Sequence, residues 1–406
     1  MPHTKSRVLV LDPDFEHDGG HNYVTNQILA GRVKSEVRIM CPVTLTASVN
    51  IQGAELCRAF PRNSYVLEES LSILEQIALK LRLHNPVGKL QAEMRDAFAT
   101  AISGQLADMN ASSRDSILIH TGSCFLFDAL LQALEKWPSD SWPALHLRQL
   151  RPVADLEKAA FIHQRLRECR RNTDVYMYAE TDAFAAQLGK LGHQTSEIEK
   201  LEISDLGRSL SPSPAIQNFV EVAVLGTVRR EKGHGRLEAI GRAYHKLSKI
   251  KSLPILMFNI HTGAIKNGRL FKRMVKGLDR WNINYSLHKQ SADVAGHWQC
   301  LAGSHIVLIP YEADRYTDRG SGVCIDAIAH GRPLIVSGRC TLEEYLRGGN
   351  GLSAESEEEF AQRIAQIAES HKAFAEGSLQ LASEFRARQK NHPLFARLDA
   401  TFNSSR

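Results

Sequence analysis

The sequence contains no hydrophobic run of about 18 or more residues, which excludes an ordinary transmembrane helix. Its first residues, MPHTKSRVLVLDPDF, lead directly into a strand-like segment and lack the apolar core of a secretory signal peptide. The seven cysteines are scattered singly, without a C-x-x-C pair, as is usual for reduced thiols. We therefore expect a cytoplasmic protein, either free or peripheral at the inner face of the cytoplasmic membrane.

Several motifs that mark particular chemistries are also missing. Neither H-E-x-x-H nor another cluster with metal-ligand spacing occurs, and G-x-G-x-x-G is absent. No basic tract is interleaved with aromatic residues, as single-stranded nucleic acid would require. Asp12-Pro13-Asp14 has the form of a metal–diphosphate motif, but it encloses a proline and directly follows the first strand. We expect no metal site and no nucleic-acid partner.

What is present is typical of a globular protein with more than one domain. The chain has 406 residues, of which 43% are hydrophobic and 23% charged, and this length suggests two or three domains. The net charge of +5 suits an anionic substrate or an anionic membrane surface. A predicted helix that carries Lys80 and Arg82 beside leucines could rest on anionic lipid, although a solvated helix face is the ordinary reading of such a pattern.

The most informative stretch runs from residue 305 to residue 338 and predicts strand, polar loop, helix and strand. HIVLIPY is an apolar run of the kind found in strands buried on both faces. Ser321 is placed as the N-cap of the following helix, with Gly322 just inside it. Such a helix start presents free N–H groups and a positive dipole end to an anion. Arg319 lies beside it and can chelate phosphate oxygens.

Two carboxylates flank this helix start. Asp318 precedes it and Asp326 follows about two turns later, so one can reach each end of a ligand whose middle lies at the helix N-terminus. A sugar nucleotide has this layout, with sugar hydroxyls, a diphosphate and ribose hydroxyls in order. An ordinary capped helix with surface acids remains the alternative.

The N-terminal half also alternates strands and helices, with strands predicted at 7–12, 37–42, 116–122, 143–150 and 175–181. His120 ends one of these strands, and ligands of open α/β sheets bind beyond the carboxyl ends of the strands. His120 is therefore a candidate site residue, and a structural histidine is the competing interpretation.

These motifs resemble the donor site of retaining glycosyltransferases of the GT-B group often called family 4. That family carries two acidic residues separated by seven positions, followed by A-x-A-x-G-x-P and an apolar strand. The chain is most similar to a bacterial subgroup with P-Y…Y-x-x-R-x-S-G-V-x-x-E-A. The matching residues are Pro310, Tyr311, Tyr316, Arg319, Ser321, Gly322, Val323 and Ala327. Both acidic positions are Asp here, whereas the family has Glu.

The resemblance implies further site residues. The loop from Gly226 to Gly233 is similar to the family's G-R-x-x-x-x-K-G, and it makes Arg229 and Lys232 the expected clamp on the donor diphosphate. The N-terminal Gly-Gly loop of the family gives Gly20 and His21 a place near the donor. As implied roles, Asp318, His120, Arg229 and Lys232 act in catalysis. The implied substrate-binding residues are Gly20, His21, Arg319, Ser321, Gly322, Val323 and Asp326.

The implied fold is α/β of the GT-B type, with two Rossmann-like domains that face each other across a cleft. We expect an acceptor-side domain at 1–210, a Ser/Pro-rich linker at 211–219, a donor domain at 220–385 and a C-terminal helical segment at 386–406 that packs back on the first domain. The implied function is metal-independent transfer of a hexose-type sugar from a UDP or GDP donor, without a cofactor, to a glycan or lipid-linked acceptor in bacterial polysaccharide or glycolipid synthesis. A GT-B epimerase or phosphorylase and a non-catalytic sugar-nucleotide-binding scaffold are the alternatives.

Overall fold

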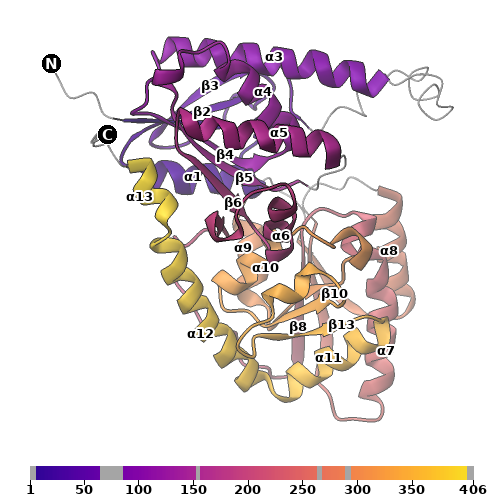
Figure 1. Ribbon diagram of the computed structural model, residues 1–406. Helices are drawn as coiled ribbons and strands as arrows, with labels where there is room; N and C mark the ends of the chain where they lie inside the picture. Colours follow the sequence, from indigo (N-terminus) through magenta and orange to yellow (C-terminus); the bar gives the residue numbers. More distant parts are fainter. Residues whose placement is uncertain (1–5, 65–85, 152–155, 263–267, 289–293, 400–406) are drawn as a thin grey trace. The chain divides into compact units, whose positions relative to one another are not determined.

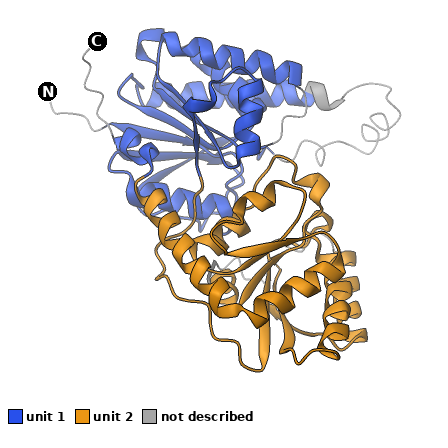
Figure 2. Cartoon of the chain, turned by 60° about the horizontal axis from the view of Figure 1, so that its bottom comes forward, with its two compact units in different colours: residues 1–201, 392–406 blue, residues 202–391 orange. Residues whose placement is uncertain are grey.

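The computed structural model describes residues 6–64, 86–151, 156–262, 268–288 and 294–399. The predicted helix with Lys80 and Arg82 lies outside these residues. The chain forms two compact units, each with its own parallel sheet (Figures 1 and 2). Within the described ranges, none of the helices is both long enough and apolar enough to cross a membrane.

Unit 1, residues 1–201 and 392–406, contains a parallel sheet of seven strands in the order β3-β2-β1-β4-β5-β6-β7. Its strands are β1 Arg7–Leu11, β2 Glu36–Pro42, β3 Ala54–Phe60, β4 Ser116–Gly122, β5 Ala144–Gln149, β6 Val175–Ala179 and β7 Ile198–Lys200. Its helices are α1 Gly20–Arg32, α3 Pro86–Asp108, α4 Cys124–Leu134, α5 Leu156–Glu168, α6 Asp182–Lys190 and α13 Pro393–Asp399. β4 is buried along its whole length, which explains why it reads as an unbroken apolar run.

Unit 2, residues 202–391, contains a parallel sheet of six strands in the order β10-β9-β8-β11-β12-β13. Its strands are β8 Phe219–Leu225, β9 Ile255–His261, β10 Asn284–His288, β11 Ile306–Ile309, β12 Leu334–Ser337 and β13 Gly351–Ala354. Its α-helices are α7 Leu237–Ser248, α8 Gly268–Arg280, α9 Val294–Gly303, α10 Gly322–Ala329, α11 Glu357–Glu369 and α12 His371–Lys390.

The helices of unit 2 cover the two faces of its sheet. One hydrophobic cluster joins the strands to α7, α8 and α11, through side chains such as Leu237, Met274 and Phe360. A second cluster joins them to α9, α10 and α12, through side chains such as Trp298 and Phe385. This arrangement is why the strands of this unit, too, read as apolar runs.

The unit boundaries fall at 201/202 and 391/392, whereas the sequence placed them at a 211–219 linker and near 385. Residues before β8 pack on unit 2, because Ser213 donates to the carbonyl of His305 and Arg332 donates to the carbonyl of Ser211. Gln389 likewise bonds both backbone groups of Ser204, at 3.0 and 2.8 Å, so α12 stays with unit 2 to its end. Composition alone does not reveal these contacts.

The last helix, α13, belongs to unit 1. The Asp399 carboxylate accepts from the N–H groups of Lys34 and Ser35, and the Ser35 hydroxyl donates to the carbonyl of Leu398 at 2.9 Å. The Arg32 guanidinium lies 3.8 Å from the centroid of the Phe395 ring. The C-terminus thereby completes the packing around α1 and β2.

Candidate functional site

Each sheet has one point where its strand order reverses, between β1 and β4 in unit 1 and between β8 and β11 in unit 2. Loops that leave neighbouring parallel strands in opposite directions open a crevice there, which is where open α/β sheets bind ligands. The loops after β8 and β11 hold the two motifs predicted to grip a diphosphate. Asp12 follows β1, and His120 lies near the end of β4. The predicted site residues of each unit therefore gather at its switch point.

The loop after β8 turns sharply and brings a lysine inward. Gly226 has φ +100° and Gly233 has φ +69°, conformations that favour glycine, and a short 3₁₀ turn, η4 Arg230–Lys232, lies between them. A Cβ at Gly233 would lie 1.8 Å from the carbonyl oxygen of Pro310. Glycine is therefore required for the close approach of this loop to the end of β11.

Lys232 is partly buried in this turn. Its ammonium lies 5.6 Å from the centroid of the Tyr311 ring, and no carboxylate pairs with it among the described residues. Burial, and then the positive charge of Arg229, lower the pKa of Lys232 to about 8. Arg229 is exposed, and its guanidinium lies 3.6 Å from the carboxylate of Glu231. The two cations expected to bind the diphosphate are thus close to each other, and Lys232 has no carboxylate partner among the described residues to balance its charge.

The loop after β11 leads to the helix start that was predicted to hold an anion. Ser321 caps α10, because its hydroxyl accepts from the N–H of Cys324 at 3.4 Å. Its own N–H donates to the Tyr345 hydroxyl at 3.1 Å. The N–H groups of Gly322 and Val323 have no acceptor among the described residues. The Val323 side chain lies in the hydrophobic core, so only its backbone is placed for a ligand.

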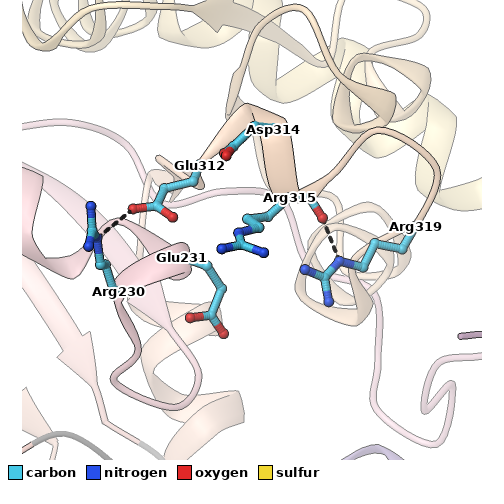
Figure 3. Close-up of a pocket in the computed structure, with 6 residues that line it drawn as sticks. All are labelled: Arg230, Glu231, Glu312, Asp314, Arg315 and Arg319. Atoms are coloured by element: carbon cyan, nitrogen blue, oxygen red, sulfur yellow. Dashed lines mark hydrogen bonds and ion pairs between the residues drawn. The ribbon is translucent and has the colours of Figure 1, made fainter. Parts of the chain in front are cut away.

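The two loops are joined directly. The N–H of Glu312 donates to the carbonyl of Glu231 at 2.9 Å, and Arg230 pairs with the Glu312 carboxylate at 3.2 Å. A hollow of about 620 Å³ lies against them (Figure 3). Its lining residues are Arg230 and Glu231 from the first loop and Glu312, Asp314, Arg315 and Arg319 from the second. The loop after β8 and the loop that leads to α10 therefore line one charged hollow, and Arg319 lies three residues before the first residue of α10.

The two predicted acidic residues have different surroundings. Asp318 is half-buried in the loop just before α10. Asp326, inside α10, accepts from the hydroxyl of Ser204 at 2.7 Å and contacts His297 Nε2 at 3.1 Å. Burial works to raise the pKa of Asp326, but the His297 and Ser204 interactions outweigh it and leave that pKa below its ordinary value. The Asp326 side chain is still 22% exposed, so it keeps capacity to accept a ligand hydroxyl.

At the switch point of unit 1, His120 belongs to a buried polar cluster. Its Nε2 lies 3.2 Å from the Asp12 carboxylate and 3.2 Å from the Asn26 side-chain oxygen. Asn22 and Asn26 also donate to Asp12, at 2.6 and 2.8 Å. Burial works to raise the pKa of Asp12, but His120 and the two amides lower it below its ordinary value. His120 Nδ1 is buried and has no partner among the described residues.

Gly20 and His21 open α1 on the same side of the sheet. Gly20 has φ +80°, and His21 Nε2 lies 3.4 Å from the guanidinium of Arg148. Arg148 is fully buried, pairs with Glu180 at 2.7 Å and donates to the carbonyl of His120 at 3.4 Å. The structure thus links two of the predicted residues, His21 and His120, through an arginine that the sequence did not reveal.

The two carboxylates of the Asp12-Pro13-Asp14 motif interact with different partners. Asp12 faces His120, whereas Asp14 pairs with Arg151 and accepts from both the N–H and the hydroxyl of Ser64. Burial raises the pKa of Asp14 in spite of Arg151. In the part of the chain that the structure describes, no three His, Cys, Asp or Glu side chains are grouped to hold a metal ion.

Sequence reasoning missed several residues of both sites. Glu231, Glu312 and Arg315 line the hollow, and only the dense charge of their loops hinted at this. Asp12 and Arg148 were missed as parts of the His120 cluster. An ionisable residue inside or just after an apolar run was the available signal, because such a charge needs a partner when buried.

No protein-family model matches the sequence, and no curated protein sequence matches it. Solved structures do match over nearly the whole chain. It is similar to a glycosyltransferase from Rickettsia africae ESF-5, with 12% identity, 99% of this chain and 100% of that chain covered, and a TM-score of 0.65. It is also similar to sucrose-phosphate synthase from Thermosynechococcus elongatus, with 14% identity, 97% and 100% covered, and a TM-score of 0.63. Anabaena HepE in complex with UDP-glucose matches with 13% identity, 97% and 98% covered, and a TM-score of 0.60.

These identities are low, so the likeness establishes the fold alone. The two parallel-sheet units have the GT-B architecture, and the predicted fold class is confirmed.

Proposed function

We propose that this chain is a retaining glycosyltransferase of the family 4 type, which transfers a hexose-type sugar from a UDP or GDP donor to a glycan or lipid-linked acceptor. A role in bacterial polysaccharide or glycolipid synthesis is part of the proposal. The observation that carries it is the contact between the loop that holds Lys232 and the loop that leads to α10, at the β8/β11 switch point. The glycosyltransferase from Rickettsia africae with the same fold supports it, and so does Anabaena HepE, which was solved with UDP-glucose bound.

In this proposal, unit 2 stabilises the leaving nucleoside diphosphate. Arg229, Lys232 and the N–H groups of Gly322 and Val323 draw negative charge onto it as the glycosidic bond breaks. Arg319 adds a further cation, and its guanidinium lies against the Tyr316 ring at 4.9 Å. Since these groups supply the positive charge, the reaction has no need of a metal ion.

The two carboxylates orient the donor. Asp318 binds the sugar hydroxyls, and Asp326 binds the ribose hydroxyls. The Asp326 carboxylate is oriented by Ser204 and His297. The sugar is attacked on the face from which the diphosphate leaves, and the acceptor proton passes to a donor phosphate oxygen. In unit 1, Gly20 and His21 lie near the donor, and the acceptor hydroxyl enters near Gly20 and His120.

Donor binding and product stereochemistry test the proposal. We expect UDP- or GDP-sugars to raise the thermal unfolding midpoint, because a ligand that binds the folded state alone stabilises it. Transfer to an added glycan or lipid acceptor should give a product with the anomeric configuration of the donor, measured by NMR. Donor isomerisation or phosphorolysis without transfer would instead support another GT-B activity.

Asp318→Ala should lower kcat/KM at least about tenfold, because it removes a charge-assisted hydrogen bond to the sugar. Glu384→Ala, an exposed carboxylate on α12, is the matched control and should leave kcat/KM unchanged. If Asp318→Ala keeps full activity, or if no nucleotide sugar binds, the assigned site is wrong.

A further inference from the structure

The positive charge of the chain is concentrated in unit 2. Residues 237–281 contain ten lysines and arginines but only two acidic residues, which gives this stretch a formal charge of +8. The whole chain carries +5, so the remainder is negative by three charges. The stretch includes α7 and α8, which pack against each other on the outside of the unit 2 sheet (Figure 1).

The cations of α8 form a stripe on its solvent side. Met274 and Leu278 face the core, whereas Arg269, Lys272, Arg273, Lys276 and Arg280 are exposed at helical spacing. None of these five pairs with a carboxylate among the described residues, and the same holds for Lys246 and Lys249 near the end of α7.

Two arginines of unit 1 differ from these cations, because each of them pairs with a carboxylate. On α5 of unit 1, Arg165 pairs with Asp128 at 3.0 Å and also with Glu135, and the neighbouring Arg170 pairs with Glu197. The seven unpaired cations, six on α7 and α8 and one just after α7, therefore form a surface with a strong unbalanced positive potential, which suits an extended anionic partner.

Apolar side chains accompany these cations. Trp281 follows α8 and is 45% exposed, and Ile250 follows α7 and is 85% exposed. Phe219 and Ile255, at the starts of β8 and β9, are register partners and are also exposed. Helices that connect parallel strands end where the strands begin, so all four apolar side chains lie at the amino-terminal edge of the sheet.

The partner that fits both features is a lipid surface. We propose that the α7–α8 face, defined by the seven unpaired cations together with Ile250 and Trp281, binds bilayers that contain anionic phospholipid. Exposed tryptophan is favoured at the membrane–water interface, and nearby lysines and arginines are attracted to anionic headgroups. The proposal does not depend on the proposed transferase activity.

Two other occupants fit less well. Nucleic acid would be held by stacking on aromatic rings, but the guanidinium groups of Arg242 and Arg280 already lie over the Trp281 ring, at 4.9 and 5.9 Å from its centroid. A second copy of the chain, bound through the same face, would bring like charges together.

Vesicle flotation of the full-length chain tests the proposal. We expect binding to phosphatidylcholine vesicles that contain phosphatidylglycerol, weak binding to phosphatidylcholine alone, and loss of binding at high salt. The triple variant K272E/R273E/K276E should weaken partitioning at least about 100-fold, because each cation near an anionic surface contributes roughly a factor of five. Trp281→Ala should also weaken partitioning to these vesicles.

The matched control is K372E/R388E/K390E, which makes the same change of charge on exposed positions of α12. It should retain most of the binding of the unchanged chain, and both triple variants should keep their unfolding midpoints and their response to UDP. Equal loss of vesicle binding in the two triple variants would overturn the proposal. So would binding to a single-stranded oligonucleotide without binding to anionic vesicles.

Discussion

The residue on which the proposed donor site most depends is Lys232. Its ammonium lies beside an aromatic ring and near a second cation, without a carboxylate partner among the described residues. Such a position disfavours the charged form until an anion arrives. A bound diphosphate would supply that anion, so the cost of holding Lys232 charged is offset on binding.

This predicts a pH dependence of nucleotide affinity. The pKa of Lys232 is lowered to about 8, below the roughly 10.4 of an unfolded lysine. The unfolded chain therefore binds this proton more tightly than the folded chain does. Below pH 8 the charged lysine lowers the free energy of unfolding, and this loss of stability disappears as the pH rises from about 8 to roughly 10.4. Diphosphate affinity should change in the opposite direction, falling above pH 8 by up to about tenfold per pH unit.

Calorimetric titration of UDP between neutral and alkaline pH measures this effect. Lys232→Arg keeps its charge throughout and should show a flat profile over the same range. Parallel losses of affinity in the unchanged chain and in the variant would assign the pH dependence to another group.

Gly233 makes a second prediction at this scale. With φ +69° and the Pro310 carbonyl 1.8 Å from the position of a Cβ, Gly233→Ala must push the two loops apart. We expect a loss of about 2–5 kcal/mol of unfolding free energy, from left-handed strain and overpacking together. UDP binding should be lost as well. Gly348→Ala, at φ +58° with no atom near its Cβ, carries the strain alone and should bind UDP normally.

Local pattern was enough to propose some residues of the candidate site and not others. Some of these residues, Lys232, Ser321 and Asp318, belong to contiguous motifs in which the neighbouring residues define a turn or a helix start. The partners of Asp326 could not be read in this way, because Ser204 lies 122 positions away in the sequence. The Asp12–His120 pair likewise exists only because β1 and β4 are neighbours in the sheet.

At the scale of elements, the start of α10 is the feature that links the fold to the proposed function. Both α10 and α11 begin with a serine whose hydroxyl accepts from the third helical N–H, Ser321 in one case and Ser356 in the other. Only α10 begins at the switch point of the sheet. A comparison of the two N-cap serines therefore distinguishes the effect of capping a helix from the effect of beginning that helix at the switch point.

Ser321→Ala and Ser356→Ala should each lower the free energy of unfolding by about 1 kcal/mol, the usual effect of losing an N-cap. Only Ser321→Ala should weaken UDP binding, because the N-terminus of α10 is the one proposed to hold the diphosphate. Chemical denaturation and calorimetry on the same preparations would check both statements. Equal effects of the two variants on UDP affinity would remove α10 from the donor site.

Most elements were predictable because burial on both faces leaves a continuous apolar run. The strands predicted at 7–12, 37–42, 116–122, 143–150 and 175–181 are confirmed as β1, β2, β4, β5 and β6. The edge strands β3 and β7 were missed. Most of β3, AELCRAF, is only partly buried and includes charged residues, and β7 has three residues. A strand with one open side lacks the pattern that marks the others.

At the scale of the whole molecule, the C-terminal helix α13 belongs to the same unit as the N-terminal half of the chain. Unit 1 is built from the two ends of the sequence, and α13 contacts α1, the turn before β2, and β7 after the whole of unit 2 has intervened. Arg397 pairs with Glu199 of β7 at 2.6 Å, and Asp399 holds the turn before β2. The two units cannot therefore be separated by a single cut in the sequence.

Removal of residues 392–406 should consequently weaken unit 1 and spare unit 2. Leu394 and Leu398 are buried, and losing even one such leucine typically costs about 2–5 kcal/mol. Hydrogen exchange measured by mass spectrometry should show faster exchange in α1, β2 and β7, while β8, β9 and β11 exchange as in the full chain. Faster exchange in both units would mean that they unfold as one cooperative body. Unchanged exchange in unit 1 would mean that α13 adds nothing to its stability, despite the ion pair and hydrogen bonds that hold it.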